Sequence, residues 1–257
     1  MAVRVLLLAD IHANAASLEA VLFDAGARGF DRVAFLGDAV GYGPDPAFVL
    51  DRLADLDAAC ILGNHDAWLL DTAAGRVQSG LGLVGDALRW QLTHLEERHL
   101  AQLRSWPHRS ALNLPGRVPV AELLHGSPRE DFEYMDSISL ARAVFSEWPG
   151  KLAFVGHTHL PGVYATLEGP VGEWVKHHAA HEEHLALRFP PLARWIVNPG
   201  SAGQPRDGDP RASYAIFDDR LEQVDIYRVP YDVEGTVHAA RAAGLPEFFA
   251  ARLAVGR

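Results

Sequence analysis

The chain has 257 residues, 49% of them hydrophobic, and a formal net charge of −10. These values are typical of a globular protein large enough to bury a substantial core. The acidic balance argues against tight, non-specific binding to long nucleic acids, which requires a positive surface, but it does not exclude a nucleotide in a locally positive pocket.

The chain begins with a short apolar run, residues 3–9, which is interrupted by Arg4 and ends at Asp10. It is too short for the apolar core of a signal peptide with its cleavage site, or for a membrane span, so we expect a buried strand. The single cysteine, Cys60, cannot form an internal disulfide, which is compatible with a reducing compartment. We therefore expect a cytoplasmic protein that does not associate with membranes.

The first third of the chain alternates between strand and helix patterns. Apolar runs at 3–10, 31–38 and 58–66 are separated by residues 14–29 and 45–56, in which apolar side chains recur at helical spacing. This order predicts parallel strands joined by right-handed crossovers. Functional groups in such sheets gather at the carboxyl ends of the strands, where this sequence places polar clusters.

The pattern changes after residue 66. Residues 67–110 have a mostly helical pattern, and the short runs from 118 to 230 are separated by Gly, Pro and Asp, as expected for a second, mostly antiparallel sheet. We expect one domain, 1–257, with a helical insert near 67–110 and a C-terminal helical tail near 232–257. Either segment could cover a site or form a contact in an oligomer.

Seven side chains at the predicted strand ends are oxygen or nitrogen ligands suited to divalent first-row transition metals. They are Asp10, His12, Asp38, Asn64, His125, His157 and His159. In two cases the ligands are two residues apart, so if each pair continues a strand, its side chains project to the same side. One such pair alone is more often a turn or a helix cap, but all the motifs in this order predict a metal site.

Seven ligands are too many for one ion. If Asp38 bridges two ions, it binds one with Asp10, His12 and His159 and the other with Asn64, His125 and His157. Both ions then keep open positions, as catalytic sites require. A shared carboxylate places two ions roughly 3.5–4 Å apart, the separation of two-metal hydrolases. The two histidines of the GHTH motif would bind different ions.

The ordered motifs DIH, GD, GNHD, H and GHTH between residues 10 and 159 resemble the signature of the calcineurin-like metallophosphoesterases. GDAVGYGPDP and NPGSAGQPRDGDPRASYAI resemble its small bacterial and archaeal phosphodiesterase branch. The resemblance implies an α/β (α+β) fold, a four-layer αββα sandwich of two mixed β-sheets flanked by helices. It also implies the division of ligands between two ions given above.

The resemblance further implies hydrolysis of phosphodiesters, and also of phosphomonoesters, through attack by a hydroxide that bridges the two ions. His65 would protonate the leaving oxygen or stabilise charge on the phosphoryl group, and Asp66 would orient His65. We expect Mn²⁺ as the metal, with Fe, Co, Ni or Zn compatible with the same ligands. The expected substrate is a small, nucleotide-like phosphoester.

Four further residues each have two interpretations. Asn14 could cap the helix that follows it or touch the substrate, and the cap is favoured. Arg206 and Arg211 lie in a Gly- and Pro-rich loop, where either could bind phosphate oxygens or pair with a neighbouring aspartate. Tyr42 could bind the substrate or close a turn.

A second histidine-rich segment, VKHHAAHEEH, places His177, His181 and His184 at helical spacings that could form a surface metal site. No supporting residues mark such a site, so a solvated, charged surface is the favoured interpretation.

Two other functions stay open for the chain, because a fold alone never proves an activity. One is a catalytically silent metal-binding scaffold or assembly subunit of the same fold, and the other is a protein phosphatase. The complete ligand set and the presence of His65 favour a metal-dependent phosphoric ester hydrolase over the scaffold.

Overall fold

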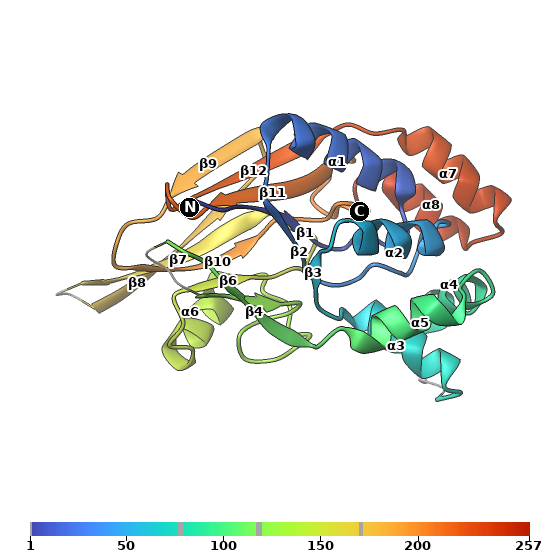
Figure 1. The fold of residues 1–257 in the computed structure, drawn as a ribbon, viewed down its shortest axis with the longest axis horizontal. Coiled ribbons are helices and arrows are strands. Elements are labelled where there is room, and N and C mark those ends of the chain that lie inside the picture. Colours follow the sequence, from blue (N-terminus) through green and yellow to red (C-terminus); the bar gives the residue numbers. More distant parts are fainter. Residues whose placement is uncertain (1, 77–79, 117–119, 170–171) are drawn as a thin grey trace.

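The computed structural model describes residues 2–76, 80–116, 120–169 and 172–257, and two six-stranded sheets dominate it (Figure 1). The first sheet runs, in spatial order, through β3 (Ala59–Cys60), β2 (Arg32–Phe35), β1 (Arg4–Leu8), β11 (Ala212–Asp218), β12 (Gln223–Val229) and β9 (His184–Arg188). The second runs through β4 (Arg109–Asn113), β5 (Val120–Leu124), β6 (Leu152–Phe154), β10 (Ala193–Asn198), β7 (Gly162–Gly169) and β8 (Gly172–Ala179).

Both sheets are mixed. In the first sheet β1, β2 and β3 are parallel, as the alternating pattern predicted, and β11, β12 and β9 add antiparallel strands. In the second sheet β5, β6 and β10 are parallel, and the outer pairs are antiparallel. The expectation that all late strands form one mostly antiparallel sheet is therefore wrong, because β11 and β12 return to pair beside β1.

The alternation of side chains along β1 explains the layers. Leu6 and Leu8 pack with apolar side chains of α1 (Ala15–Arg28) and α2 (Pro46–Asp55) on the outer face of the first sheet. Val5 and Leu7 point the other way, into a core shared with the second sheet. The outer face of the second sheet packs against α6 (Ile138–Glu147), for example through Phe145. The predicted four-layer fold class, two mixed sheets flanked by helices, is confirmed.

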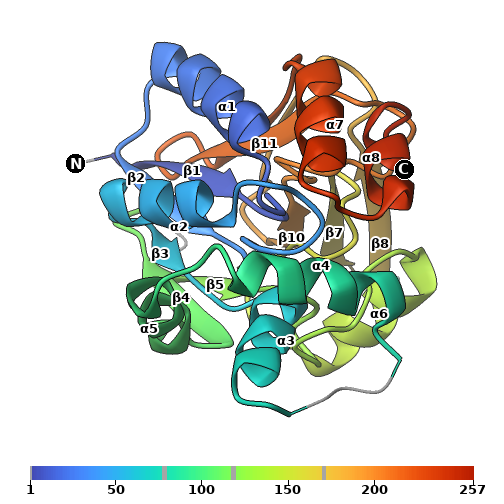
Figure 2. The same ribbon diagram turned by 90° about the vertical axis from the view of Figure 1, so that its right-hand side faces the viewer.

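The remaining helices lie around one end of the sheets, which faces the viewer in Figure 2. They are α3 (Asn64–Ala73), α4 (Gly82–Leu92) and α5 (Glu97–Ser105), and α7 (Val233–Ala242) with α8 (Glu247–Leu253). A small apolar cluster joins the two sets, because Ala87 of α4 and Phe249 of α8 both belong to it together with Tyr42. Helices α3 to α5, α7 and α8 therefore border the end of the sheets where the loops after β1 and β2 emerge.

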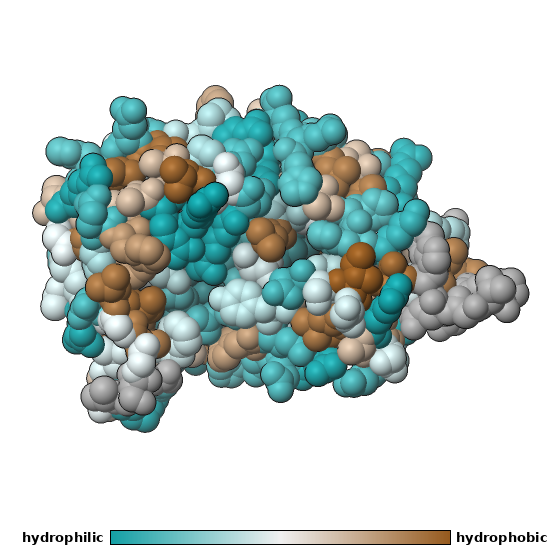
Figure 3. Space-filling view, turned by 180° about the vertical axis from the view of Figure 1, so that it is seen from behind, coloured by the Kyte–Doolittle hydropathy of each residue, from teal (hydrophilic) through white to brown (hydrophobic). Residues whose placement is uncertain are grey.

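The surface opposite to the view of Figure 1 carries separate apolar patches among hydrophilic residues (Figure 3). Within the described residues, the helices are too short or too polar to cross a lipid bilayer.

Candidate metal centre

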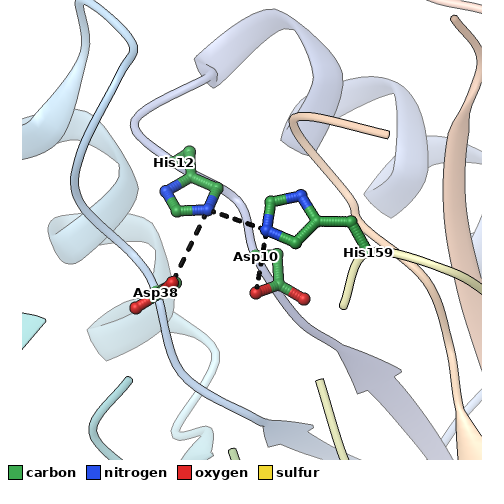
Figure 4. Close-up of side chains that lie close together, drawn as sticks. All are labelled: Asp10, His12, Asp38 and His159. Atoms are coloured by element: carbon green, nitrogen blue, oxygen red, sulfur yellow. Dashed lines mark hydrogen bonds and ion pairs between the residues drawn. The ribbon is translucent and has the colours of Figure 1, made fainter. Parts of the chain in front are cut away.

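Four buried side chains meet where three loops leave the sheets. Asp10 and His12 follow β1, Asp38 follows β2, and His159 follows β6. These side chains point toward one another (Figure 4). The Nε2 atom of His12 lies 3.6 Å from Oδ2 of Asp38 and 3.2 Å from Nε2 of His159, which is 3.4 Å from Oδ1 of Asp10. One ligand atom from each residue lies within 4.8 Å of the others, so this first donor group could hold a metal ion.

A second donor group shares Asp38 with the first. It adds His125, after β5, and His157, after β6, again with ligand atoms within 4.8 Å of one another. The Nε2 atom of His125 lies 3.4 Å from Oδ2 of Asp38 and 3.1 Å from Oδ1 of Asn64. A single oxygen, Oδ2 of Asp38, thus faces both His12 and His125. The structure brings the seven predicted ligands together in the two sets that the ligand count suggested.

The backbone at five of the seven donors is left-handed, and the sequence argument that the paired residues continue a strand is wrong. The φ angles are 53° at Asp10, 50° at His12, 63° at Asp38, 67° at His157 and 59° at His159. Left-handed conformations are unfavourable for residues other than glycine, and they persist where surrounding contacts fix them. The side chains converge because tight loops turn them inward, and these five donors account for most of the nine such residues in the described chain.

Two glycines allow the loops to approach each other. Gly37 has φ 93°, and a Cβ there would lie 2.6 Å from the backbone nitrogen of Gly63 and 2.7 Å from Nδ1 of His125. A Cβ on Gly63 would lie 2.1 Å from Oδ1 of Asp38. Backbone hydrogen bonds hold the same loops together, since the N–H of Asp10 donates to the carbonyl of Gly37 at 3.0 Å. The glycines of the GD and GNHD motifs are therefore required by close packing.

The histidine rings are oriented by backbone carbonyls. The Nδ1 atoms contact carbonyl oxygens in three cases: His12 with Val40 at 2.8 Å, His125 with Leu36 at 2.7 Å and His159 with Gln204 at 2.5 Å. A carbonyl can only accept, so Nδ1 carries the proton and Nε2 of the neutral ring presents a lone pair. His12 and His159 thus aim two lone pairs at each other across 3.2 Å. This repulsive contact, with two carboxylates beside it, fits a cation between them.

Burial perturbs the pKa values of these groups. It raises the pKa of Asp10 to about 8 and lowers the pKa of His12 and of His159 well below the ordinary value. Burial would also raise the pKa of Asp38 and lower that of His125, but their mutual attraction outweighs it: the pKa of Asp38 falls below its usual range and that of His125 rises to about 9. Such a cluster of buried donors is unfavourable unless charge is compensated, which a divalent cation would do.

The expectation that Asp66 orients His65 is wrong. The Asp66 carboxylate accepts hydrogen bonds from four backbone N–H groups, those of Asp38 (2.8 Å), Ala39 (3.0 Å), Val40 (3.2 Å) and Gly63 (2.9 Å). The predicted third strand is only two residues long, and α3 begins at Asn64, so Asp66 is the third residue of this helix. It therefore fixes the loop that carries Asp38.

His65 lies beside the first donor group. Its ring centroid is 4.7 Å from that of His12 and 4.5 Å from that of Tyr42. Burial lowers the pKa of His65 to about 4, and its Nδ1 atom is buried without a hydrogen-bond partner among the described residues. Since a buried N–H without an acceptor is rare, the neutral ring is expected to keep its proton on Nε2.

Of the four residues that had two interpretations from the sequence, Asn14 and Arg211 have structural roles. The Asn14 side chain accepts from the backbone N–H of Ser17 at 3.1 Å and donates to the carbonyl of Gly203 at 2.8 Å, so the favoured helix cap is confirmed. Its amide is satisfied within the protein, which speaks against contact with a substrate. Arg211 pairs with Asp209, with Nη2 2.6 Å from Oδ2, and this pair stabilises the loop.

The other two residues, Arg206 and Tyr42, contact each other next to the donor groups. Nη2 of Arg206 donates to the Tyr42 hydroxyl at 3.2 Å and to Oε1 of Gln204 at 3.2 Å. The Tyr42 ring lies 4.4 Å from that of His12, between centroids. The positive charge of Arg206 acts on Asp10, whose pKa it lowers against the effect of burial. Arg206 thus faces the site, and Tyr42 supports it.

Sequence reasoning missed three residues near the centre. Tyr134, 47% exposed, places its ring centroid 3.9 Å from that of His157. Gln204 holds His159 through its carbonyl and Arg206 through its side chain. Arg252, on α8, lies close enough to Arg206 for the two charges to interact. An aromatic residue in a polar loop shortly after His125 was a weak signal for Tyr134, whereas nothing in the sequence marked Arg252.

The histidine-rich segment 175–184 is not helical. His177 lies in β8 of the second sheet and stacks on Tyr164, and His184 lies in β9 of the first sheet and contacts Asp225 at 2.8 Å. The helical spacing that suggested a surface metal site therefore does not exist.

The chain is similar to known proteins over most or all of its length. Residues 3–220 match the family model described as the calcineurin-like phosphoesterase superfamily domain. An uncharacterised protein of Methanocaldococcus jannaschii is 33% identical over 252 residues, covering 97% of both chains. The crystal structure of a metallophosphoesterase from Sphaerobacter thermophilus is 36% identical, with a TM-score of 0.82 and complete coverage of both chains. A protein of Pyrococcus horikoshii shares the fold, with a TM-score of 0.77 at 19% identity, over 99% of this chain and 98% of its own.

Proposed function

Because the chain belongs to the calcineurin-like phosphoesterase superfamily, we propose that it is a binuclear metal-dependent hydrolase of small phosphodiesters. The observation that carries the proposal is the pair of buried donor groups that share Oδ2 of Asp38. One cation in each group would leave both with open positions for a substrate. We propose Mn²⁺ as the native metal, because mixed carboxylate, imidazole and amide ligands accommodate it.

The protein's own groups prepare the site for such cations. Carbonyls hold three imidazoles with Nε2 toward the centre, and the Asp66 carboxylate fixes the Asp38 loop. Because these contacts are made within the protein itself, little reorganisation would be needed at the moment of reaction. When bound, divalent cations would neutralise phosphate oxygens and acidify the attacking water.

His65 is proposed to assist the leaving oxygen. A neutral imidazole with its proton on Nε2 can donate a hydrogen bond to negative charge that develops there. The buried, unpartnered Nδ1 atom supports this tautomer. The role is one of charge stabilisation and proton donation, and it does not require Asp66.

Arg206 is proposed to bind an oxygen of the reacting phosphate. Its guanidinium is held by the neutral acceptors of Tyr42 and Gln204, so the positive charge stays available for an anion. Tyr42 then positions Arg206 through its hydroxyl, in place of the direct substrate contact considered from the sequence.

The test is a metal-stripped protein reconstituted separately with Mn²⁺, Fe²⁺, Co²⁺, Ni²⁺ and Zn²⁺. Each form is assayed on phosphomonoesters, cyclic nucleotides, linear diesters and dinucleoside polyphosphates. We expect metal-dependent hydrolysis of diesters. His65→Asn should lose about 10²-fold in kcat while keeping its metal content. His238→Asn, on the exposed face of α7, is the matched control and should behave as wild type. Inactivity with every metal and every substrate would overturn the proposal in favour of a metal-binding scaffold.

A further inference from the structure

The loop of residues 125–137, between β5 and α6, places an accessible aromatic ring beside the second donor group. Phe132 is 36% exposed, and its ring centroid lies 6.1 Å from that of His125 and 6.4 Å from that of His157. The same loop carries Tyr134, the exposed ring that adjoins His157. Aromatic surface that is left open to solvent thus gathers around the two histidines of this donor group.

Contacts of the loop hold the Phe132 ring in position. The backbone N–H of Gly126 donates to the carbonyl of Asp131 at 2.7 Å, and Met135 is buried in the apolar cluster beside α6. The carbonyl of Phe132 accepts a hydrogen bond from the ring of His157. The exposure of the Phe132 ring therefore belongs to a loop that is anchored on both sides of it and that supports a donor of the site.

Phe132 also lines a shallow depression of the surface. The depression has a volume of about 470 Å³, and its other lining residues are Arg109, Arg129, Glu130 and Asp131. Sites for small molecules commonly have volumes of about 300–1,000 Å³. Because Phe132 borders both the depression and His125, a molecule held at the second donor group could extend past this ring into the depression.

The side chains of the depression favour a flat, uncharged occupant. Its two arginines are paired with carboxylates, Arg109 with Asp131 and Arg129 with Glu133 at 3.3 Å, so they offer little free charge to another phosphate. The Phe132 ring and the paired guanidinium groups have flat faces. Bases of nucleotides stack on such faces. The depression therefore fits an aromatic ring of the size of a base.

We propose that Phe132 and this depression form a subsite for an aromatic ring in the ester group that stays on the phosphate. The inference rests on the proposed function, in which the leaving oxygen lies toward His65. His65 is beside His12 of the first donor group, whereas Phe132 is beside His125 of the second. The retained ester group would therefore extend toward Phe132. The preferred substrates are diesters whose retained group carries a base or another aromatic ring.

Two matched substrates test the proposal with the Mn²⁺-loaded protein. Benzyl 4-nitrophenyl phosphate and cyclohexylmethyl 4-nitrophenyl phosphate have the same leaving group and retained groups of similar size, but only the benzyl group is flat. Phe132→Leu removes the aromatic ring and keeps an apolar side chain and the backbone carbonyl. We expect this variant to lose about tenfold in kcat/KM on the benzyl ester, as for the loss of one stacking contact, and to change less than about twofold on the other ester. Unproductive binding of the nitrophenyl group in the subsite would not alter kcat/KM.

The control is Phe23→Leu, which makes the same change at a ring of α1 that is 84% exposed. Helix α1 covers the outer face of the first sheet, so neither ester should be affected. An equal loss on both esters in Phe132→Leu, or no loss on the benzyl ester, would overturn the subsite.

A binding measurement separates this inference from the proposed hydrolysis. Benzylphosphonate and cyclohexylmethylphosphonate have no ester bond, so calorimetric titration of the Mn²⁺-loaded protein with each needs no turnover. We expect wild type to bind benzylphosphonate about tenfold more tightly than the other phosphonate, and Phe132→Leu to abolish this preference. Equal affinities in wild type, or no binding of either, would reject the subsite even if the enzyme is active. A wild type that cleaves no ester but shows the preference would reject the hydrolase and keep the aromatic subsite.

Discussion

The carboxylate of Asp66 accepts a hydrogen bond from the backbone N–H of Asp38 at 2.8 Å, and this contact links α3 to the residue that both donor groups share. Three further N–H groups converge on the same carboxylate. Asp66 is fully buried, so bulk water does not compete with its carboxylate for these four N–H groups. The loop after β2 therefore depends on one side chain of α3.

Replacement of Asp66 by Asn should loosen the Asp38 loop. An amide has only one acceptor oxygen, so some of the four N–H groups lose their partner, at about 1–3 kcal/mol of unfolding free energy. We expect metal affinity to fall about 10–100-fold, as for other residues that support metal ligands. Equilibrium dialysis with metal analysis and urea unfolding measure the two effects.

The control for this change is Asp86→Asn, an exposed acid of α4 that pairs with Arg89. It should alter neither quantity. If Asp66→Asn kept its metal affinity and lost only the acidic limb of its pH–rate profile, Asp66 would act on His65 after all.

His157 and His159 should be needed for different metal ions. The first belongs to the second donor group and the other to the first. We expect His157→Asn and His159→Asn each to lower the metal content from about two ions to about one per chain. The Mn²⁺ spectra of the two variants should differ, because a different ligand set remains in each. A crystal structure with both histidines on a single ion would contradict the assignment.

The stability of the metal-free protein should depend on pH through two buried histidines. Burial lowers the pKa of His157 to about 3 and that of His65 to about 4, against 6.5 in the unfolded chain. Between pH 6.5 and about 4 the unfolded chain binds protons that the folded state does not. These residues therefore contribute stability above pH 6.5 that is lost on acidification, at up to about 1.4 kcal/mol per pH unit each.

The measurement is the difference in unfolding free energy between wild type and His65→Asn/His157→Asn at pH 7, 6 and 5. Asp10, whose pKa is raised to about 8, makes the folded state less stable as the pH rises, which is opposite to the effect of the two histidines. Asp10 is present in both proteins, so the difference between them removes its contribution. We expect the advantage of wild type to shrink as the pH falls. An advantage that stays constant would mean that both rings protonate freely in the folded state.

Arg228 should matter for the loop that carries Arg206. Its guanidinium is bonded to the Asp207 carboxylate, and the two side chains are only 1% and 8% exposed. Arg228→Met leaves a buried carboxylate unpaired, so we expect a loss of about 3–5 kcal/mol of unfolding free energy. Arg228→Met/Asp207→Asn should recover part of it. Because Arg206 adjoins Asp207, KM should rise in the single variant while the metal content stays unchanged.

The sequence predicted the fold because the apolar runs and helical patterns of the first third formed the expected strands and helices, although the third strand is only two residues long and the end of its run begins α3. It also predicted which side chains would meet, since parallel strands bring Asp10, Asp38 and Asn64 to the same edge. The reason given for the convergence of the paired ligands, that each pair continues a strand, was wrong. Left-handed φ values at His12 and His159 depend on contacts between loops, which no local pattern reveals.

Other contacts lay beyond the reach of sequence patterns for a similar reason. The family resemblance implied that Asp66 orients His65, but the first turn of α3 directs the carboxylate to backbone N–H groups of another loop. Arg206 and Arg252 are 46 positions apart in the sequence, and their proximity depends on how α8 packs. Tertiary packing, which periodicity does not encode, decided both cases.

Because both donor groups include Asp38, metal binding has a mechanical consequence for the two sheets. Asp10, His12, Asp38 and Asn64 extend from the first sheet, whereas His125, His157 and His159 extend from the second, and each donor group draws on both. Two ions would therefore hold the sheets together at one end, while apolar packing and a hydrogen bond from Arg32 of β2 to the carbonyl of Asn113 of β4, at 2.9 Å, join them elsewhere. Relative motion of the two sheets would then be smallest at the metal end. A force that pulls the sheets apart would separate them first at the opposite end.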